Sequence, residues 1–430
     1  MRSIRLILLL VVTQGSLGAQ GVLIKDARVF DGERVIPRAS VLVRDGKIEQ
    51  IGPHIRAPRN VSVVDGRGKT LIPGLIDAHT HIHSRRDLEQ SAVFGITTDI
   101  SMLMDLQLAE AEKAEQSANK ASDRADLFSS GYVATAPGGH GTEYGLKFTT
   151  LTGPEGAQAW VDDRIAEGSD FIKIIYEYGG DTGHGGRPSI DRATLGALVV
   201  AAHARGRLAV VHIHSEQQAM DAIESGADGL AHLFAFGDDS VDPKFVPLVA
   251  EHHAFVIPTF SVLESVCNQG PGQHLLNDSK LSPYVAADYL PQLRKNINHG
   301  QPHNCMFSMT AIPPLAAAHV RILAGTDAGN PGTAPGVSIH GELEYLVKAG
   351  LTPQQALAAA TSVPASTFHL TDRGRIASGL RADLVLVNDD PTAEITATRD
   401  IVEVWKAGIP VDRQSWRQSI DSAASDGPSQ

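Results

Sequence analysis

An alternation of short apolar strands and amphipathic helices across residues 71–360 is the feature that most constrains the fold. The predicted strands cover residues 71–72, 96–98, 171–175, 209–211, 229–230, 255–257 and 322–324. The predicted helices cover residues 106–121, 154–167, 191–204, 216–225 and 353–360. This pattern is typical of parallel βα units, and their number is near eight. We predict an α/β fold, a (β/α)8 TIM barrel rather than a doubly wound sheet, because the polar candidate residues described below follow strand C-termini.

Both ends of the chain are rich in short strands instead. Residues 22–24, 41–43 and 48–51 are β-rich, and Asp45-Gly46 predicts a hairpin turn between the last two. Two further predicted strands, 382–387 and 401–405, follow the barrel region. The polar segment from Ser415 onward is predicted to fray.

Charge limits the classes of partner. The 430 residues include 37 Lys and Arg against 49 Asp and Glu, a formal net charge of −12, with no basic cluster. This balance argues against a nucleic-acid partner or an anionic membrane surface. Oligomeric state cannot be read from the sequence, and a homo-oligomer stays open.

The N-terminus predicts export. A short basic region at residues 1–5 precedes an apolar run at residues 6–12, and small residues follow up to Ala19. We expect a signal peptide, residues 1–19, cleaved near Ala19, and a periplasmic or secreted protein. The apolar run is far shorter than the roughly 20 residues that cross a bilayer, and no other long apolar run follows, so no stable membrane insertion is expected. Cys267 and Cys305 could form a disulfide or stay as two buried thiols.

The strongest local motif is Pro73-Gly74-Leu75-Ile76-Asp77-Ala78-His79-Thr80-His81. Residues i and i+2 of a strand point to the same face, so His79 and His81 can converge on one ion. Imidazole binds zinc and similar first-row metals. We therefore favour a metal site over two ordinary histidines.

Lys173 lies inside the apolar strand Phe171-Ile172-Lys173-Ile174-Ile175. A buried ammonium loses hydration energy, which lowers its pKa. Two interpretations are equally compatible with the residues: an ordinary cation at the strand end, or a neutral amine that takes up carbon dioxide and forms a carbamate bridging two metals.

Three further candidate ligands follow predicted strands. His212 lies in Val210-Val211-His212-Ile213-His214, and His232 ends Gly229-Leu230-Ala231-His232. Asp327, in Gly325-Thr326-Asp327-Ala328-Gly329, suits a metal ligand or a general base. Together with the earlier residues they predict a site for divalent metal, zinc being favoured and Mn, Co or Fe left open.

In this order the motifs resemble the amidohydrolase superfamily, and the resemblance extends from about residue 21 to 412. It is carried by PGLIDAHTH, FIKI, VVHIH, GLAHL, GTDAG and GLRADLVLV. The resemblance implies a distorted barrel at 72–371, a small β-sandwich formed by 20–71 and 372–414, and a flexible tail at 415–430. It also implies that His79, His81 and Asp327 hold the more buried metal. His212 and His232 would hold the other, and a carbamylated Lys173 would bridge them.

The subgroup resembles imidazolonepropionase-like and Xaa-Pro dipeptidase-like members, because Pro137-Gly138-Gly139-His140-Gly141 is similar to their glycine-histidine loop. Secreted ochratoxin-type amidohydrolases are similar as well. Three departures put dipeptide specificity in doubt: the bulky stretch 174–180, the apolar stretch 233–236 after His232, and His214 where several dipeptidases carry Tyr.

These residues predict hydrolysis of an amide in a dipeptide, an N-acyl amino acid or an aryl amide. A water shared by two divalent ions has a lowered pKa and serves as the nucleophile, with Asp327 as general acid and base. His214 either donates to the oxyanion or orients a ligand. The residues expected to contact substrate are His140, Tyr176, Tyr178 and His184. Ester, lactone or cyclic-amide hydrolysis is the nearest alternative, and a non-catalytic binding module is a remote one.

Overall fold

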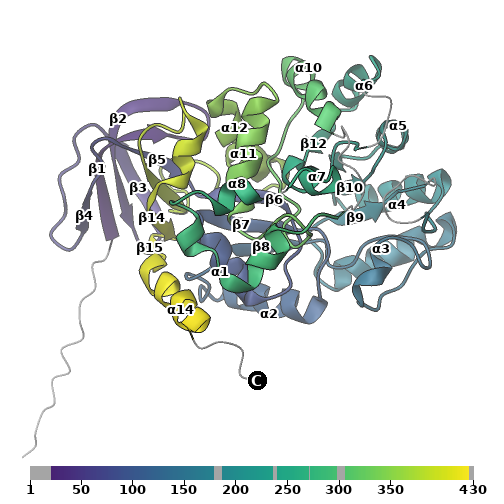
Figure 1. The fold of residues 1–430 in the computed structure, drawn as a ribbon, viewed down its shortest axis with the longest axis horizontal. Coiled ribbons are helices and arrows are strands. Elements are labelled where there is room, and N and C mark those ends of the chain that lie inside the picture. The colour runs from purple at the N-terminus through teal and green to yellow at the C-terminus, as the bar shows by residue number, and fades with distance from the viewer. Residues whose placement is uncertain (1–20, 179–185, 236–239, 271, 298–305, 426–430) are drawn as a thin grey trace, which may run out of the picture.

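The structure is a computed structural model that describes residues 21–178, 186–235, 240–270, 272–297 and 306–425. The predicted signal peptide, His184 and Cys305 lie outside these residues. Figure 1 shows a sheet of strands at one end of the molecule and a larger body of strands wrapped by helices beside it.

The two ends of the chain form one eight-stranded sheet, in the order β15-β14-β13-β5-β1-β2-β3 with β4 paired to β1. Its strands are β1 (Gly21–Phe30), β2 (Val35–Arg44), β3 (Lys47–Gly52), β4 (Ser62–Asp65), β5 (Lys69–Pro73), β13 (Leu384–Asn388), β14 (Ile401–Lys406) and β15 (Ile409–Pro410). Asp45 and Gly46 both have positive φ, at 51° and 76°, as a tight two-residue hairpin requires, so the predicted turn is confirmed. The sandwich arrangement of this unit stays a prediction.

One boundary differs from the prediction. The strand at residues 71–72, predicted as the first of the alternating region, belongs to β5, which pairs with β13 through Leu71 and Leu386. The first strand of the larger body is instead β6 (Leu75–Thr80). Gly74 separates the two strands, and a Cβ there would lie 2.2 Å from Oγ1 of Thr97, so the chain can pass at this point only with glycine.

The larger body has an α/β architecture with parallel strands, as predicted. One sheet contains β6, β7 (Ile96–Ser101) and β8 (Asp126–Ser129); the other contains β9 (Ile172–Ile175), β10 (Ala209–His212), β11 (Gly229–Ala231) and β12 (Phe255–Ile257). Within the described residues these continuous ladders do not close into a single barrel. Isolated bridges, Ala134 to Ile174 and Val256 to Ile322, extend the pairing, and the amide of Ala78 donates to the carbonyl of Ala324 at 2.9 Å.

Helices cover the outside of these strands (Figure 1). They are α1 (Arg85–Val93), α2 (Leu106–Ser117), α3 (Ala157–Ala166), α4 (Arg192–Ala204), α5 (Glu216–Glu224), α6 (Phe245–Glu251), α7 (Phe260–Val266), α8 (Gln273–Leu276), α9 (Leu290–Leu293), α10 (Ile312–Ala317), α11 (Ser338–Lys348), α12 (Pro353–Ala359), α13 (Ser362–Thr367) and α14 (Arg413–Ser425). Several begin where the sequence offers a cap: Asp105, Asp191 and Thr352 each accept a hydrogen bond from a first-turn amide.

The predicted fraying from Ser415 is not what the structure shows over residues 415–425, because α14 continues to Ser425. The indole Nε1 of Trp416 donates to the carbonyl of Tyr284 at 2.9 Å, and the guanidinium of Arg86 lies 5.1 Å from the Trp416 ring centroid. These tertiary contacts stabilise a helix that its polar composition alone does not favour.

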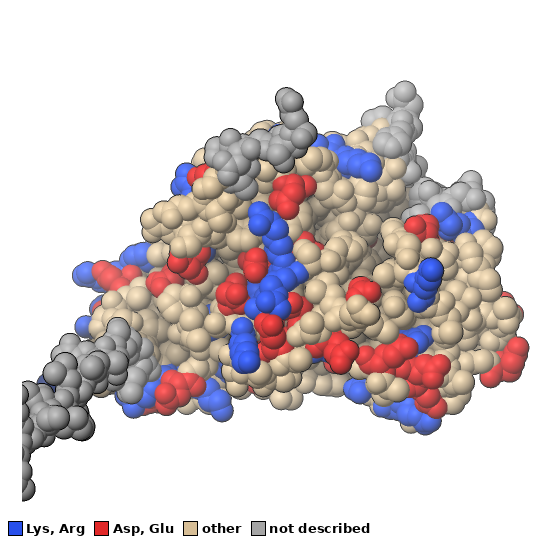
Figure 2. All heavy atoms as spheres, turned by 90° about the horizontal axis from the view of Figure 1, so that it is seen from below, with Lys and Arg blue, Asp and Glu red and all other residues tan. Residues whose placement is uncertain are grey.

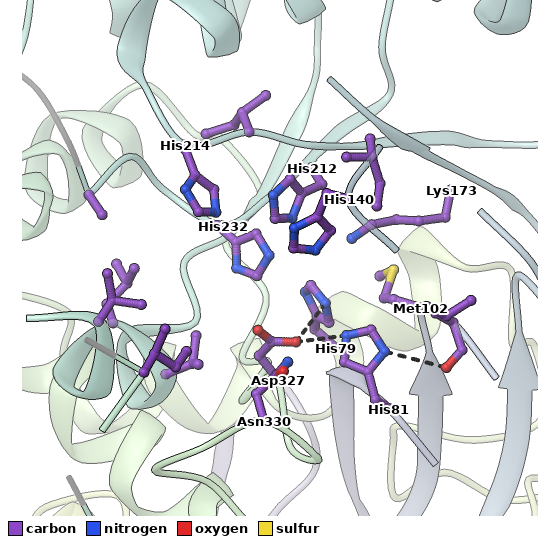
Figure 3. A pocket seen from close by; sticks show the side chains of 18 of the residues that line it. His79, His81, Met102, His140, Lys173, His212, His214, His232, Asp327 and Asn330 are labelled. Carbon is purple, nitrogen blue, oxygen red and sulfur yellow. Dashed lines mark hydrogen bonds and ion pairs between the residues drawn. The ribbon is translucent and has the colours of Figure 1, made fainter. Parts of the chain in front are cut away.

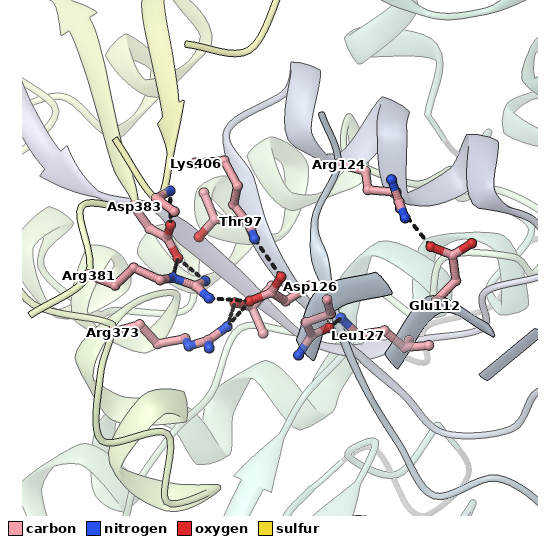
Figure 4. A network of polar contacts seen from close by, with 12 residues as sticks. Thr97, Glu112, Arg124, Asp126, Leu127, Arg373, Arg381, Asp383 and Lys406 are labelled. Atoms are coloured by element: carbon pink, nitrogen blue, oxygen red, sulfur yellow. Dashed lines mark hydrogen bonds and ion pairs between the residues drawn. The ribbon is translucent and has the colours of Figure 1, made fainter. Parts of the chain in front are cut away.

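A buried ionic network joins the terminal sheet to the larger body (Figure 4). Asp126 of β8 binds Arg373, Arg381 and Lys406, the last of these on β14. Asp126 and Lys406 are almost completely buried. The network therefore holds one unit against the other through charges that have lost most of their hydration.

The charged side chains on the outside are mixed. On the face shown in Figure 2, Lys and Arg alternate with Asp and Glu, and that face carries no broad basic surface. Among the described helices, every one is too short or too polar to pass through a bilayer.

Candidate metal centre

Strand ends bring the predicted ligands into one pocket. His79 lies near the C-terminal end of β6, and His81 follows that strand. Lys173 lies on β9, and His212 is the last residue of β10. The pocket is lined by all six predicted ligands, namely His79, His81, Lys173, His212, His232 and Asp327 (Figure 3). Their assembly at the C-terminal ends of parallel strands is the arrangement in which α/β barrels place their active sites.

The first group of ligand atoms comes from His79, His81 and Asp327. Oδ1 of Asp327 lies 3.1 Å from Nε2 of His79 and 2.9 Å from Nε2 of His81. Burial alone would raise the pKa of Asp327, but the two histidines hold it well below its ordinary value. Burial lowers the pKa of His79 to about 3. The group therefore presents an anionic carboxylate and a neutral imidazole, which are the forms that bind metals.

His81 and His232 are each oriented by a second contact. Nδ1 of His81 lies 3.3 Å from the carbonyl of Leu103, which can only accept. Nδ1 of His232 lies 2.7 Å from Oγ1 of Thr259, and that hydroxyl already donates to the carbonyl of Pro258 at 2.8 Å. Both histidines must therefore donate from Nδ1, which leaves the Nε2 lone pair for a metal.

Three residues at this centre have left-handed backbone conformations. The φ angles are 79° for His232, 55° for Thr259 and 59° for Asp327. Such angles are uncommon for residues with a Cβ and cost roughly 1–3 kcal/mol each. These backbone conformations, clustered at the strand ends, direct the side chains toward the pocket.

Lys173 is buried, with 2% of its surface exposed, and its Nζ has no hydrogen-bond partner within the described residues. Burial lowers its pKa to about 7, while Asp327 acts in the opposite direction. A buried amine with unfilled hydrogen-bonding capacity fits a position that a carbamate or a metal would complete. The donor chemistry of the whole set, nitrogen and carboxylate oxygen, suits Zn and its first-row neighbours.

The structure adds one residue that the sequence analysis missed. Glu177 lies close to three histidines: its Oε2 is 3.4 Å from Nδ1 of His140 and 3.3 Å from Nε2 of His212, and its Oε1 is 3.8 Å from Nδ1 of His214. The spacing of Glu177 from Lys173 could have indicated that it faces the site. Lys173 and Glu177 are four residues apart, which in an extended segment places them on the same face.

The residues predicted to contact substrate divide into three cases. His140 and His214 line the metal pocket, and the His140 ring stacks on that of His212 with centroids 4.8 Å apart. Tyr176 and Tyr178 do not line it: their hydroxyls donate to Oδ2 of Asp221 at 3.2 and 2.9 Å. A buried or half-buried tyrosine hydroxyl needs such an acceptor, and Asp221 supplies it on the other side of the backbone. His184 lies outside the described residues.

Most of the rest of the pocket wall is apolar, and the polar exceptions are Tyr144 and Asn330. Six of its residues are Leu103, Val133, Ile213, Leu263, Val266 and Ile297. Lys173 is the only Lys or Arg among the described residues that line it. The sequence has no Lys or Arg in the internal segments that the structure does not describe, which are residues 179–185, 236–239, 271 and 298–305.

Comparison with known proteins gives a consistent result. A model of the amidohydrolase family matches residues 70–411. An imidazolonepropionase of Cereibacter sphaeroides is 26% identical, over 86% of this chain and 93% of that protein. Among solved structures, a Xaa-Pro dipeptidase with methionine in its active site has a TM-score of 0.71 at 22% identity, covering 90% of this chain and 99% of the other. The A. niger ochratoxinase has a TM-score of 0.69 at 19% identity, covering 91% of this chain and 95% of the other.

Proposed function

The chain belongs to the amidohydrolase family and is a hydrolase acting on carbon–nitrogen bonds, and on this premise we propose that it cleaves an amide bond in a neutral, largely apolar small molecule. The observation that carries the proposal is the pocket wall. It combines a cluster of metal-binding side chains with apolar residues and offers no cation besides Lys173 within the described part of the lining.

Similarity of fold does not determine the substrate, because one fold supports many activities. The similar proteins include an imidazolonepropionase and a Xaa-Pro dipeptidase. A dipeptide or an N-acyl amino acid carries a free carboxylate. The described lining offers that group neutral donors such as Tyr144 and Asn330 but no Lys or Arg besides Lys173. Burying a carboxylate without a paired cation costs several kcal/mol, so the wall favours an aryl or alkyl amide over these two classes.

In the proposed reaction Asp327 moves the proton. A divalent metal, when bound, lowers the pKa of water and polarises a carbonyl. The carboxylate of Asp327 accepts the proton of the attacking water and delivers it to the leaving amine, while its contacts with His79 and His81 fix its position. His214 lines the pocket and is the candidate donor to the oxygen that becomes negative.

The test compares matched substrates. The zinc-supplemented protein is assayed on a neutral anilide and on the same anilide carrying a carboxylate on its acyl side. We expect kcat/KM to favour the neutral compound by about 100-fold, as the lost solvation of one carboxylate implies. Asp327→Asn is the control and should lose activity on both. A preference for the carboxylate-bearing compound contradicts the neutral-substrate proposal.

A lactone and an aryl ester of similar size complete the panel, since the same nucleophile attacks either carbonyl. Turnover of these alone would retain the metal-dependent mechanism and overturn the amide assignment. Two bound metals without turnover of any carbonyl compound would favour a binding role.

Export to the periplasm or outside the cell is also proposed. Cys267 is disulfide-bonded, and disulfides persist mainly in oxidising compartments. The only other cysteine in the sequence is Cys305. Determining the N-terminal residue of protein purified from a secretion-competent host tests cleavage near Ala19.

A further inference from the structure

The pocket contains two groups of potential ligand atoms rather than one. His79, His81 and Asp327 form the first, and His140, Glu177 and His212 form the second. In each group the ligand atoms lie within 4.8 Å of one another. Figure 3 shows His140 and His212 next to each other, across the pocket from His81. Glu177 and His140 are not among the ligands that the sequence predicts.

The distances between ligand atoms in the second group match the distances between neighbouring ligands of a bound ion. Zinc bonds nitrogen and oxygen ligands at roughly 2.0–2.2 Å, so a tetrahedral angle separates two such ligands by about 3.3–3.6 Å. Oε2 of Glu177 lies 3.4 Å from Nδ1 of His140 and 3.3 Å from Nε2 of His212. A charge-assisted hydrogen bond between the same atoms would be nearer 2.7–2.9 Å.

Burial supports the same interpretation. The side chain of Glu177 is 4% exposed and that of His212 is 7% exposed. A buried carboxylate requires compensation by cations, hydrogen-bond donors or a metal. Nitrogen atoms of three histidines, His140, His212 and His214, lie within 4 Å of its oxygens.

The local backbone fixes His140 in place. It lies in a loop with Gly138 and Gly141 at φ of 70° and 97°, angles that suit glycine. The amide of Gly141 donates to Oε2 of Glu143 at 2.7 Å, which holds the loop closed. The ring of His140 is thereby stacked on that of His212.

We propose that Glu177 and His140, together with His212, bind the second divalent metal of the centre. The chain itself then supplies a carboxylate to the second ion, in addition to whatever Lys173 contributes. This inference rests on the proposed metal-dependent function and specifies which residues hold its second ion.

Metal content is the direct test. The full-length protein and its variants are saturated with Zn²⁺, freed of excess metal by gel filtration and analysed for zinc per chain by mass spectrometry. We expect two zinc ions in the wild type and one in Glu177→Gln. Glu143→Gln is the matched control, because it removes a neighbouring negative charge outside the triad while its amide oxygen can still accept the hydrogen bond from Gly141, and it should keep two.

His140→Asn provides a second variant if Glu177→Gln does not fold, and it should also bind one zinc. Two zinc ions retained in both variants, or a single ion in the wild type, overturns the inference. The loss of one ion in Glu143→Gln as well overturns the specific donor set. If the wild type binds two ions, Glu177→Gln binds one and neither hydrolyses any substrate, the ligand assignment stands and the proposed function fails.

Discussion

Nδ1 of His232 lies 2.7 Å from Oγ1 of Thr259 and donates to it, because the threonine hydroxyl is already committed to the carbonyl of Pro258. This hydrogen bond leaves Nε2 of His232 as the atom that faces a metal. Both residues are buried and both have positive φ. The orientation of one predicted ligand therefore depends on a residue that contacts no metal.

Replacing Thr259 tests this dependence. Thr259→Val keeps the shape and the β-branch but removes the acceptor, so His232 loses its orientation. We expect metal affinity to fall by about 10–100-fold, measured by competition with a zinc-binding dye. Thr259→Ser retains the hydroxyl and should bind zinc nearly as well as the wild type. Equal affinities for the Val and Ser variants would disprove the role of this hydrogen bond.

Removal of the metals should destabilise the protein. A ligand present at 100 times its dissociation constant stabilises the native state by about 2.7 kcal/mol per site. We therefore expect EDTA to lower Tm and abolish hydrolysis, and zinc to restore both. Asp327→Asn, which lacks a carboxylate of the first triad, should show a smaller decrease in Tm. An unchanged Tm in the wild type after verified metal removal contradicts the expectation.

The buried network around Asp126 predicts a large loss of stability in Asp126→Asn. The substitution leaves Lys406 buried without the carboxylate it pairs with and removes the buried one of the two carboxylates that pair with Arg373, and breaking a buried pair typically costs about 3–5 kcal/mol of unfolding free energy. Asp372→Asn is the matched control, since Asp372 pairs with the same Arg373 but is half-exposed. Its cost should stay below about 1 kcal/mol. Urea denaturation at pH 7 compares the two variants.

The same network has a defined pH dependence. Burial alone would raise the pKa of Asp126, but Lys406, Arg381 and Arg373 outweigh it and lower the pKa to about 2 from 3.8. The stabilisation is therefore complete above pH 4 and is lost as the pH falls toward 2. The difference in Tm between wild type and Asp126→Asn should shrink between pH 4 and pH 2. A difference that stays constant over this range would exclude the ionised carboxylate as its cause.

The disulfide of Cys267 should also contribute to stability. Cys267 is fully buried directly after α7, whose residues Leu263 and Val266 line the pocket. Losing a disulfide of this kind typically costs about 2–4 kcal/mol. Reductant should lower the Tm of the wild type and leave that of Cys267→Ser unchanged. A wild-type mass that does not increase on reduction would show that the bond does not form.

The sequence predicted that the candidate ligands come together because they follow strands, and strand ends have a fixed place in parallel α/β folds. His79 and His81 illustrate this, since a period of two determines their common face. Glu177 was missed although its spacing from Lys173 indicates the same face, because it lies beyond residue 175, where both the predicted strand and β9 end. The sequence also did not indicate that the hydroxyls of Tyr176 and Tyr178 bind Asp221. Their direction is set by Asp221 on α5, which local sequence cannot reveal.

At the ends of the chain, too, local sequence indicated the strands but not the contacts between distant segments. The strands of the terminal sheet were visible as β-rich runs and as an Asp-Gly turn. The pairing of β5 with β13 was not, because it joins segments far apart in the sequence. The helix α14 was also hidden, since it depends on Trp416 meeting Tyr284 in the folded protein.

The pairing of β5 with β13 has a consequence for synthesis of the chain. Roughly 300 residues separate these strands, and a ribosome adds about 5–20 residues per second, so β5 waits on the order of 15–60 s for its partner. Throughout that time one edge of an apolar strand is open to other nascent chains. Growth at a lower translation rate lengthens this interval, so the yield of soluble protein should depend on chaperone supply more than on the stability of the finished fold.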